Sequence, residues 1–485
     1  MKKNITYNFL GMRATVACLM VLLISVSSCK KGLNINEDPN NPTEVPLRMV
    51  LPSAQVNLAY TLGGSVNRIS GSVIQHYSGH RTQPLEYARF DLTPATTDNI
   101  WSSLYAGVLQ DLSDISVKGT ESGDLVYVGM AKILTAYTYS VLTDSYGDIP
   151  FSTALGGVEN VNPSYDKQET IYPQLITLIT DGIANVKSGA GSEQPSEVDD
   201  LMFGGDVAKW EKFGNALKLR LYNHLSKIDP AAALTFLNTN PVLMSSNADN
   251  SGVKFGGSAS AANPIHQFDQ LSGRSDNAIA ATIINKMKEL ADPRIPVFFN
   301  TIPSGGLAGQ YIGNIPGSGN EDGDLTRYSR SGSAYASINS PVLFLSYAEQ
   351  NFIIAEIQQR AGNTAAAGVA YNAAVIADIT SLGLSAGDAS TYLVKPTVAY
   401  NNTLQRIMEQ KWITMFQGPY ESWVDWRRTG FPVLTAPSVN RTGGVFPRRF
   451  SYPQLEINLN RQALENGPGV PVPYKTILTG VWWDK

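Results

Sequence analysis

The chain has 485 residues, of which 43% are hydrophobic, and this is enough apolar material to bury a large core without cross-links. Its formal net charge of −4 excludes the concentrated basic face on which nucleic-acid binding depends. Its 2 cysteines, Cys18 and Cys29, both lie near the N-terminus, so no disulfide framework is expected in the folded part.

The N-terminus has the parts of an export signal in their usual order. Lys2, Lys3 and Arg13 supply a positive start. Residues 14–26 follow as an apolar stretch that is too short to span a bilayer. Small residues then lead into Cys29 in the run Val-Ser-Ser-Cys, which resembles a bacterial lipobox.

This resemblance implies that residues 1–28 are removed and that the sulfur of Cys29 is acylated. Each buried CH₂ of an acyl chain contributes about 0.8 kcal/mol, so two or three chains hold a protein firmly on a membrane. The alternatives are a plain secretory signal with an incidental cysteine, or an N-terminal membrane anchor. The favoured interpretation is a protein tethered to a membrane surface outside the cytoplasm.

Residues 29–46 are predicted to be a flexible tether between lipid and folded domain. Asn, Asp, Glu and Pro dominate this segment, and it has too few apolar residues to fold alone. No later stretch is long and polar enough to link two domains, so residues 47–485 are expected to form one domain. No later run approaches the apolar length of a membrane span, which predicts a domain that is soluble apart from its anchor.

The domain is predicted to be mostly α-helical, with helices in pairs. Apolar residues recur at helical spacing over 97–117, 124–142, 169–186, 209–225, 341–361 and 363–382. In the last pair, Gly362 is placed to end one helix and Asn363 to cap the next. Small residues would let these two helices approach closely: Ala355, Ala361, Ala366, Ala370 and Ala374. Helix–turn–helix pairs of this kind resemble tetratricopeptide units, here degenerate because their spacing is irregular.

Residues 245–335 interrupt this helical pattern. They are rich in Gly, Ser, Asn and aromatic residues and show few helical periods. A loop-rich insertion of this length in a compact domain usually carries function. We therefore expect this insertion to form the ligand-binding half of the domain.

Signals for a metal site are weak. His76 and His80 have the spacing of two metal ligands on a helix, but Tyr77 stands where the metalloprotease motif has Glu, and no third ligand is evident. A solvated or hydrogen-bonding role is favoured for both histidines. The run 321–324 (Glu-Asp-Gly-Asp) lacks the spaced ligands of a calcium loop and is predicted to be a solvated acidic turn.

Signals for catalysis and for cofactors are also weak. Residues 383–387 match the nucleophile-elbow pattern around Ser385, but that motif needs a preceding strand and here follows a helical run. The pattern is therefore interpreted as a chance match in a loop. The sequence contains neither a Walker loop nor a dinucleotide fingerprint. We expect no catalytic residues, no metal and no cofactor.

Aromatic residues are the better guide to a ligand. Flat rings pack against the apolar faces of sugars, while amides, carboxylates and arginines bind hydroxyl groups. Many rings have polar or Gly-rich neighbours, although any single ring can also simply fill the core: Tyr77, Tyr87, Phe90, Phe255, Phe268, Tyr311, Tyr328 and Tyr335. The rings between 255 and 335 are expected to be exposed, because little periodic burial surrounds them. For Trp101, which lies on an amphipathic helix, a core position and a ligand-binding position are equally favoured.

The most specific motifs lie toward the C-terminus. The matching stretches are Thr143–Phe151, the helix of Trp210–Leu225, Glu421–Pro432 in the pattern E-x-W-x-D-x-R-R-T-G-x-P, and Pro447–Pro453 followed by Glu456 and Asn458. Together with the lipobox they resemble the SusD/RagB family of nutrient-binding outer-membrane lipoproteins of Bacteroidota. The match covers essentially the whole mature chain.

This resemblance implies four degenerate tetratricopeptide-type units and a ligand site in the loop-rich half. It also implies a partner, a SusC-type TonB-dependent outer-membrane transporter, to which the lipoprotein delivers a glycan or, in some members, a peptide. On this basis the candidate ligand-binding residues are Tyr77, Arg81, Trp101, Phe268, Arg274, Tyr328 and Tyr335. The arginines of the C-terminal motifs are expected to pair with carboxylates and cap helix ends: Arg427, Arg428, Arg448 and Arg449.

Two other functions remain open at this point. The chain would also suit a surface glycan- or peptide-binding lipoprotein that acts without a transporter. A lipid-anchored hydrolase that uses the acidic and Ser-rich loops is a third hypothesis. The prediction that we favour is a non-enzymatic nutrient-binding lipoprotein of the outer membrane that faces the cell surface.

Overall fold

The computed structural model describes residues 45–274, 276–319, 324, 327–473 and 475–484. The predicted lipobox with Cys29, the signal sequence, most of the tether and residues 321–323 of the acidic run lie outside this part of the chain. Residues Leu47–Lys485 form one compact unit.

Helices make up almost all of the regular secondary structure of this unit, and the sequence predicts a mostly α-helical domain. Its strands are short and form separate antiparallel pairs. β1 (Ile149–Pro150) pairs with β2 (Tyr165–Asp166), β3 (Ser251–Val253) with β6 (Val342–Leu345), and β4 (Phe299–Asn300) with β5 (Arg330–Ser331).

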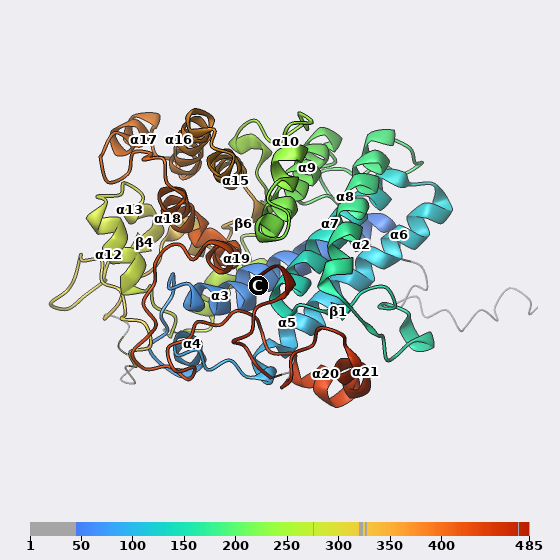
Figure 1. Cartoon of the computed structure of the whole chain (residues 1–485), viewed down its shortest axis with the longest axis horizontal. Helices are drawn as coiled ribbons and strands as arrows, with labels where there is room; N and C mark the ends of the chain where they lie inside the picture. Colours follow the sequence, from blue (N-terminus) through green and yellow to red (C-terminus); the bar gives the residue numbers. More distant parts are fainter. Residues whose placement is uncertain (1–44, 275, 320–323, 325–326, 474, 485) are drawn as a thin grey trace, which may run out of the picture. The chain divides into compact units, whose positions relative to one another are not determined.

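One half of the unit is a stack of long consecutive helices. They are α6 (Gln110–Ser122), α7 (Leu125–Tyr146), α8 (Gln168–Ser188) and α9 (Val207–His224), and each packs against the next, as Figure 1 shows. α7 and α8 approach closely because two glycines face each other. A Cβ on Gly129 would lie 2.6 Å from the carbonyl oxygen of Gly182, so only glycine fits there.

A second group of helices forms the other side of the unit. The predicted pair at 341–382 is α15 (Tyr347–Arg360) and α16 (Thr364–Ser381), which pack together; α17 (Ala386–Leu393), α18 (Leu404–Thr414) and α19 (Pro419–Thr429) follow. Gly362 has a left-handed φ of 78°, as expected of a residue that ends a helix. Asn363 precedes α16, but its side chain makes no capping bond and donates to Gln358 instead.

Two details of the predicted pair are wrong. Residues 342–345 form strand β6, so the helix begins only after Ser346, whose side chain caps it. Of the small residues expected at the helix contact, Ala361 and Ala366 are exposed, whereas Ala355, Ala370 and Ala374 are buried.

The remaining helices are short or lie in the N-terminal part. They are α2 (Leu47–Thr61), α3 (Asn67–Val73), α4 (Thr82–Ala88), α5 (Asp98–Ser102), α10 (Ala232–Leu237), α11 (Pro264–His266), α12 (Ala281–Glu289), α13 (Ile295–Phe298), α14 (Ser333–Ala336), α20 (Gln454–Leu459) and α21 (Arg461–Asn466). The insertion at 245–335 contains only short elements apart from α12, in agreement with its predicted loop-rich character.

α7 is long and apolar enough to span a membrane by length and composition. The expectation that no later run approaches the apolar length of a membrane span is wrong for this helix. In the fold, 83% of its apolar window is buried, which identifies it as a core helix.

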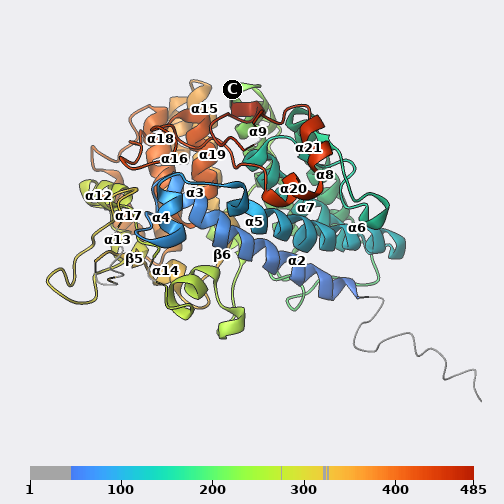
Figure 2. The ribbon, with the colours of Figure 1, turned by 90° about the horizontal axis from the view of Figure 1, so that it is seen from below.

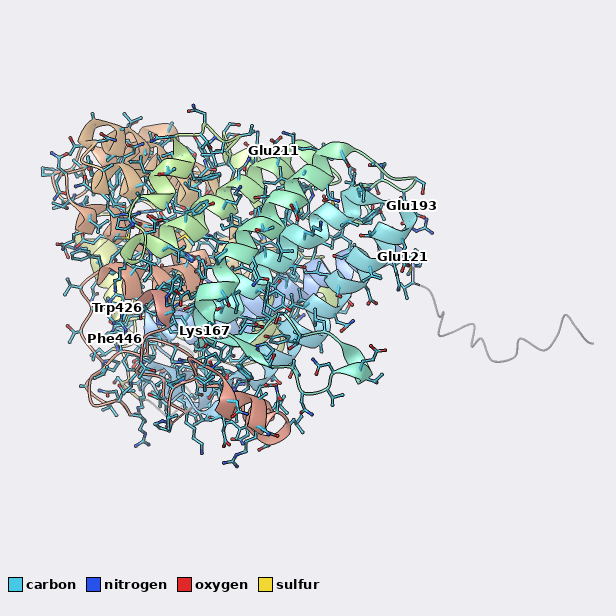
Figure 3. All side chains as sticks on the ribbon, turned by 45° about the vertical axis from the view of Figure 1, so that its right-hand side comes forward. Glu121, Lys167, Glu193, Glu211, Trp426 and Phe446 are labelled. Carbon is cyan, nitrogen blue, oxygen red and sulfur yellow. The ribbon has the colours of Figure 1, made fainter. Side chains whose placement is uncertain are left out.

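The C-terminal arginines pair with carboxylates and cap a helix end, as predicted. Arg428 binds Glu356 and Asp425, each at 2.6 Å, and Arg448 binds Asp484 at 2.8 Å. Arg427 and Arg449 instead donate to backbone carbonyls in the last turn of α7 and so cap that helix. Next to these motifs the rings of Trp426 and Phe446 lie against each other, with centroids 4.8 Å apart (Figure 3).

A buried ionic network links four helices, α7, α9, α15 and α19. His224 of α9 lies between two carboxylates: its Nδ1 is 3.1 Å from Asp144 of α7, and its Nε2 is 3.0 Å from Glu421 of α19. Arg220, one turn earlier in α9, binds Glu349 of α15 at 2.7 Å. Burial alone would lower the pKa of His224, but Glu421 and Asp144 outweigh burial and raise it to about 9.

Stability is therefore expected to decrease at alkaline pH. The pKa of His224 is higher in the folded than in the unfolded state, so its charge stabilises the fold fully below about pH 6.5 and progressively less up to about pH 9. The free energy of unfolding should fall in this window by up to about 1.4 kcal/mol per pH unit. Urea denaturation between pH 6 and 9 measures it. His224→Gln should be less stable at pH 6 and lack this slope, and an unchanged slope in the variant would refute the assignment.

Candidate functional site

Two of the candidate ligand-binding rings belong to the core. Tyr77 is 1% exposed and Tyr335 is 4% exposed. Both rings pack against Phe416, at centroid distances of 5.4 and 5.2 Å. The expected exposure of Tyr77 and Tyr335 is therefore wrong, because a residue from the distant C-terminal part of the chain covers both rings. Phe255, also expected at the surface, is buried, and so are Tyr87 and Phe90.

Trp101 is also a core residue. It is 6% exposed and contacts the rings of Tyr105 and Tyr146 at 4.7 and 5.1 Å. Of the two positions that the sequence left open for Trp101, the structure favours the core position. The helix that carries it is nevertheless part of the groove described below.

Three other candidates lie together, as the sequence analysis expected of ligand-binding residues. The guanidinium groups of Arg68 and Arg274 lie over the ring of Phe268, 4.2 and 4.6 Å from its centroid. Arg274 and Arg81 both bind Asp276, each at 2.7 Å. We call these five residues the arginine cluster. It joins the segment before α4 to the loop-rich insertion.

The carboxylates of this region have opposite pKa shifts. Burial alone would raise the pKa of Asp276, but hydrogen bonds from Thr82, Arg274 and Arg81 outweigh it and lower the pKa. Burial raises the pKa of Asp269 to about 7, although Arg330 and Arg68 act against the rise. The charge of this region therefore changes near neutral pH.

The last candidate, Tyr328, lies beside His80, with ring centroids 5.4 Å apart, and is half-buried. His80 and His76 are both fully buried, so of the solvated or hydrogen-bonding role favoured for them, the solvated role is wrong. His76 packs on Trp412 at 5.1 Å, and burial lowers its pKa to about 3. Within the described ranges, no group of three or more His, Cys, Asp or Glu residues is placed to hold a metal ion.

The nucleophile-elbow pattern is a helix cap. Ser385 precedes α17, and its hydroxyl accepts from the backbone N–H of Asp388 at 3.0 Å and donates to the carboxylate of Asp388 at 2.7 Å. The segment before it is the end of α16, not a strand. This confirms that the sequence pattern is a chance match.

The structure shows a surface groove that the sequence analysis missed. It has a volume of about 260 Å³ and lies between α2 with its extension Leu62–Val66 and α5 with its extension Ser103–Leu109. Figure 2 shows these helices alongside each other. We call it the helical groove. Its lining residues are Asn57, Tyr60, Thr61, Ser65, Asn99, Ile100, Ser103 and Gly107.

Two stripes of polar and small residues build the groove. Asn57, Thr61 and Ser65 recur every fourth residue along one helix, and Asn99, Ser103 and Gly107 do so along the other. Residues four apart share one face of a helix, so each stripe forms one wall. This spacing was visible in the sequence, but polar stripes on two amphipathic helices are also typical of solvent-exposed faces.

Both extensions of the groove helices are π-helical. The wider π turn occurs at Leu62–Val66 and at Ser103–Leu109. Such segments are rare and often lie at functional sites. Ser65 and Gly107, which line the groove, lie within these segments.

The groove offers uncharged hydrogen-bonding groups. Among the described residues, no hydrogen-bond partner is found for four polar groups of the lining: the side-chain amides of Asn57 and Asn99 and the hydroxyls of Tyr60 and Ser103. None of the lining side chains is an acid, a lysine or an arginine. The ring of Tyr60 is half-buried and is held edge-on by Phe255, with centroids 5.7 Å apart. A flat ring with free amides around it suits a neutral molecule with many hydroxyl groups.

The groove and the arginine cluster are neighbours. Arg68 donates to the hydroxyl of Ser65, which lines the groove, at 3.4 Å. A ligand longer than the groove would therefore reach the arginine cluster at this end. The two regions together combine a stacking ring, free amides and guanidinium groups.

The sequence model of the SusD-like family, described as starch-binding and associating with the outer membrane, matches residues 39–453. No curated protein sequence matches the chain. A solved chitin-binding protein superposes with a TM-score of 0.78 at 26% identity, over 91% of this chain and 100% of that chain.

Other solved structures share the fold. A SusD/RagB family protein from Bacteroides thetaiotaomicron has a TM-score of 0.77 at 24% identity, over 91% of this chain and 99% of that chain. A chitin-binding SusD homolog from Flavobacterium johnsoniae has a TM-score of 0.73 at 24% identity, over 90% and 98%. The tetratricopeptide-like helical fold expected from the sequence is thereby confirmed.

Proposed function

The chain belongs to the SusD-like family, and from this membership we propose that it is a lipid-anchored protein of the outer-membrane surface that binds a neutral glycan in the helical groove. It delivers this glycan to a SusC-type TonB-dependent transporter. The family is one of binding proteins, and the chain is proposed to act without catalysis.

The chemistry of the helical groove carries the proposal. Tyr60 supplies a ring for the apolar face of a sugar, and Asn57 and Asn99 supply donors and acceptors for its hydroxyls. The uncharged lining favours a neutral ligand over an anionic one. A volume of about 260 Å³ suits a short stretch of a sugar chain, whose remainder lies on the surface.

Chitin and starch fragments are the first ligands to test. Starch appears in the description of the family, and the solved relative at 26% identity is named for chitin binding. Both polymers are neutral, in accord with the groove. Of the residues first predicted from sequence, Arg81, Phe268, Arg274 and Tyr328 are proposed to meet the part of the ligand that extends past Ser65. Tyr77, Trp101 and Tyr335 are buried and are proposed to support the surrounding fold without touching the ligand.

Tyr60→Ala is expected to weaken binding of chitohexaose or maltohexaose by about 10- to 100-fold, because removing a stacked ring costs on the order of 1–3 kcal/mol. The measurement is isothermal titration calorimetry of the purified domain. Tyr222→Ala is the control, since its half-buried ring lies on α9 against Phe236. An equal affinity in Tyr60→Ala and wild type would show that the groove does not hold the sugar.

Cys29→Ala is expected to release the protein from the membrane, because the acyl chains are proposed to be its only anchor. The measurement is fractionation of cells after salt and carbonate washing. Cys18→Ala, within the proposed signal, is the control and should leave the mature protein bound. A Cys29→Ala variant that stays in the membrane without a transporter would contradict the lipid anchor.

The proposed partner distinguishes this function from that of a stand-alone binding lipoprotein. Delivery requires that the lipoprotein and a TonB-dependent barrel associate. Affinity purification from solubilised outer membranes should recover the two together. If the sugar is still taken up by cells that lack this barrel, the stand-alone alternative is favoured.

A further inference from the structure

A second hollow lies near the C-terminus, apart from the helical groove. It has a volume of about 580 Å³ and is formed by the segment before β2 and by α20 and α21. We call it the C-terminal hollow. Its size lies within the range of about 300–1,000 Å³ that is common for small-molecule sites.

The lining of this hollow is rich in free amides. Asn162, Gln462 and Asn466 line it, and their side chains have no hydrogen-bond partner in the part of the chain that the structure describes. Its lining contains no carboxylate, and its one cation, Arg461, is paired with Glu465 at 2.8 Å. Amides that offer both a donor and an acceptor suit neighbouring hydroxyl groups of a neutral sugar.

The floor of the hollow is fixed by buried hydrogen bonds. Asn460 is 5% exposed and donates to the carbonyl of Pro163 at 3.0 Å and to Glu456 at 3.2 Å. Tyr165 donates to the same carboxylate at 2.6 Å. The Oδ1 of Asn460 is a buried acceptor with no donor. A buried acceptor without a donor is costly, so a donor from a ligand would be favourable there.

An apolar side chain flanks the amides. Leu459 lines the hollow and is 74% exposed, although most leucines of the fold are buried. It offers an apolar surface for the C–H face of a sugar. The combination of free amides, an unsatisfied buried acceptor and an exposed leucine distinguishes this hollow from an ordinary solvated surface.

The hollow and the helical groove are on neighbouring elements. The backbone N–H of Leu455, in α20, donates to the carboxylate of Asp98 at 3.1 Å, and the next residue, Asn99, lines the groove. α5 and α20 lie close together in both Figure 1 and Figure 2. The helix that helps to form the groove, α5, and the helix that helps to form the hollow, α20, are therefore in direct contact.

We propose that the C-terminal hollow is a second carbohydrate site, which binds another part of the same neutral polysaccharide. This inference rests on the proposed function, because the hollow adds a contact to a glycan that the groove already holds. Two linked contacts raise affinity for a long chain far more than for a short one.

The test compares long and short sugars. Gln462→Ala combined with Asn466→Ala removes exposed side chains and should leave folding unchanged. The ligand is chitohexaose or maltohexaose, whichever the wild type binds more tightly. The double variant is expected to bind this hexasaccharide about 10-fold more weakly than the wild type does. Its affinity for the matching disaccharide should equal that of the wild type. Gln405→Ala, an exposed amide on α18, is the control and should bind both like wild type.

The outcomes separate the two proposals. Unchanged binding of the hexasaccharide by the double variant, with loss in Tyr60→Ala, would overturn the second site and leave the proposed function in place. Equal weakening for hexasaccharide and disaccharide would also overturn it, because the hollow would then not be a separate contact. A wild type that binds neither hexasaccharide would overturn both proposals.

Discussion

Gly107→Leu is expected to lose glycan binding by at least about 100-fold, because its side chain would fill the helical groove. A Cβ at Gly107 has only Asn57 near it, with the side-chain nitrogen at 3.7 Å, which is an ordinary contact. A longer side chain would extend toward Asn57 and occupy the place of the sugar. Calorimetric titration with the hexasaccharide that the wild type binds measures the loss.

The matched control is Gly107→Ala. Its single methyl group fits the space, so it should keep most of the binding. Neither variant should lower stability, since Gly107 does not need a left-handed backbone and glycine inside a helix is itself unfavourable by roughly 0.5–1 kcal/mol. A Gly107→Leu protein that binds like wild type would exclude the groove as the site.

Glu356→Gln is expected to destabilise the fold by about 3–5 kcal/mol, because it breaks a buried ion pair and leaves Arg428 with one of its two carboxylate partners, Asp425. Glu356 of α15 binds Arg428 of α19 through both oxygens, at 2.6 and 2.8 Å, and accepts from Asn223 of α9 at 2.8 Å. Burial alone would raise its pKa, but Arg428 outweighs burial and lowers it to about 2. The carboxylate therefore stays charged at neutral pH.

Denaturant unfolding at pH 7 measures this loss. Glu289→Gln is the control, because its ion pair with Lys286 is largely exposed and such pairs contribute about 0–1 kcal/mol. Because the pKa of Glu356 is lower in the folded than in the unfolded state, its contribution is present above about pH 4.5 and is lost as the pH falls toward 2. If Glu356→Gln and Glu289→Gln lowered the free energy of unfolding by the same small amount, the buried ion pair of Glu356 and Arg428 would not hold the helices together.

The helices could be predicted because their apolar residues repeat at a fixed spacing. α8 and α9 begin and end within two residues of the predicted ranges. Strand β6 was missed because its sequence, Val-Leu-Phe-Leu, is a short apolar run, and such a run fits a buried helix as well as a strand. Its pairing with β3, almost a hundred residues earlier, decides between the two, and pairing is not visible in a single sequence.

The burial of aromatic rings could not be predicted from their neighbours in sequence. Tyr335 follows a run of Gly and Ser, which suggested an exposed loop, yet Phe298 and Phe416 enclose it. Both rings come from other parts of the chain. The arginine cluster was partly predicted, because Arg81, Phe268 and Arg274 were proposed together, but Arg68 and Asp276 were not.

The groove was missed because its walls carry no unusual residue. Asn57 and Asn99 are ordinary surface residues in their own helices, and only the packing of the two helices brings them to one site. A repeat of polar or small residues every fourth position on two helices was the available signal. The π-helical turns at Leu62–Val66 and Ser103–Leu109 were not predicted from the sequence.

The central claim is that a neutral sugar binds in the helical groove. The most direct measurement is a crystal structure of the mature protein with chitohexaose or maltohexaose bound. The account predicts a sugar ring against Tyr60 and between the two helices, with the amides of Asn57 and Asn99 bound to its hydroxyls. A sugar that binds elsewhere on the protein and leaves this groove empty would contradict the account.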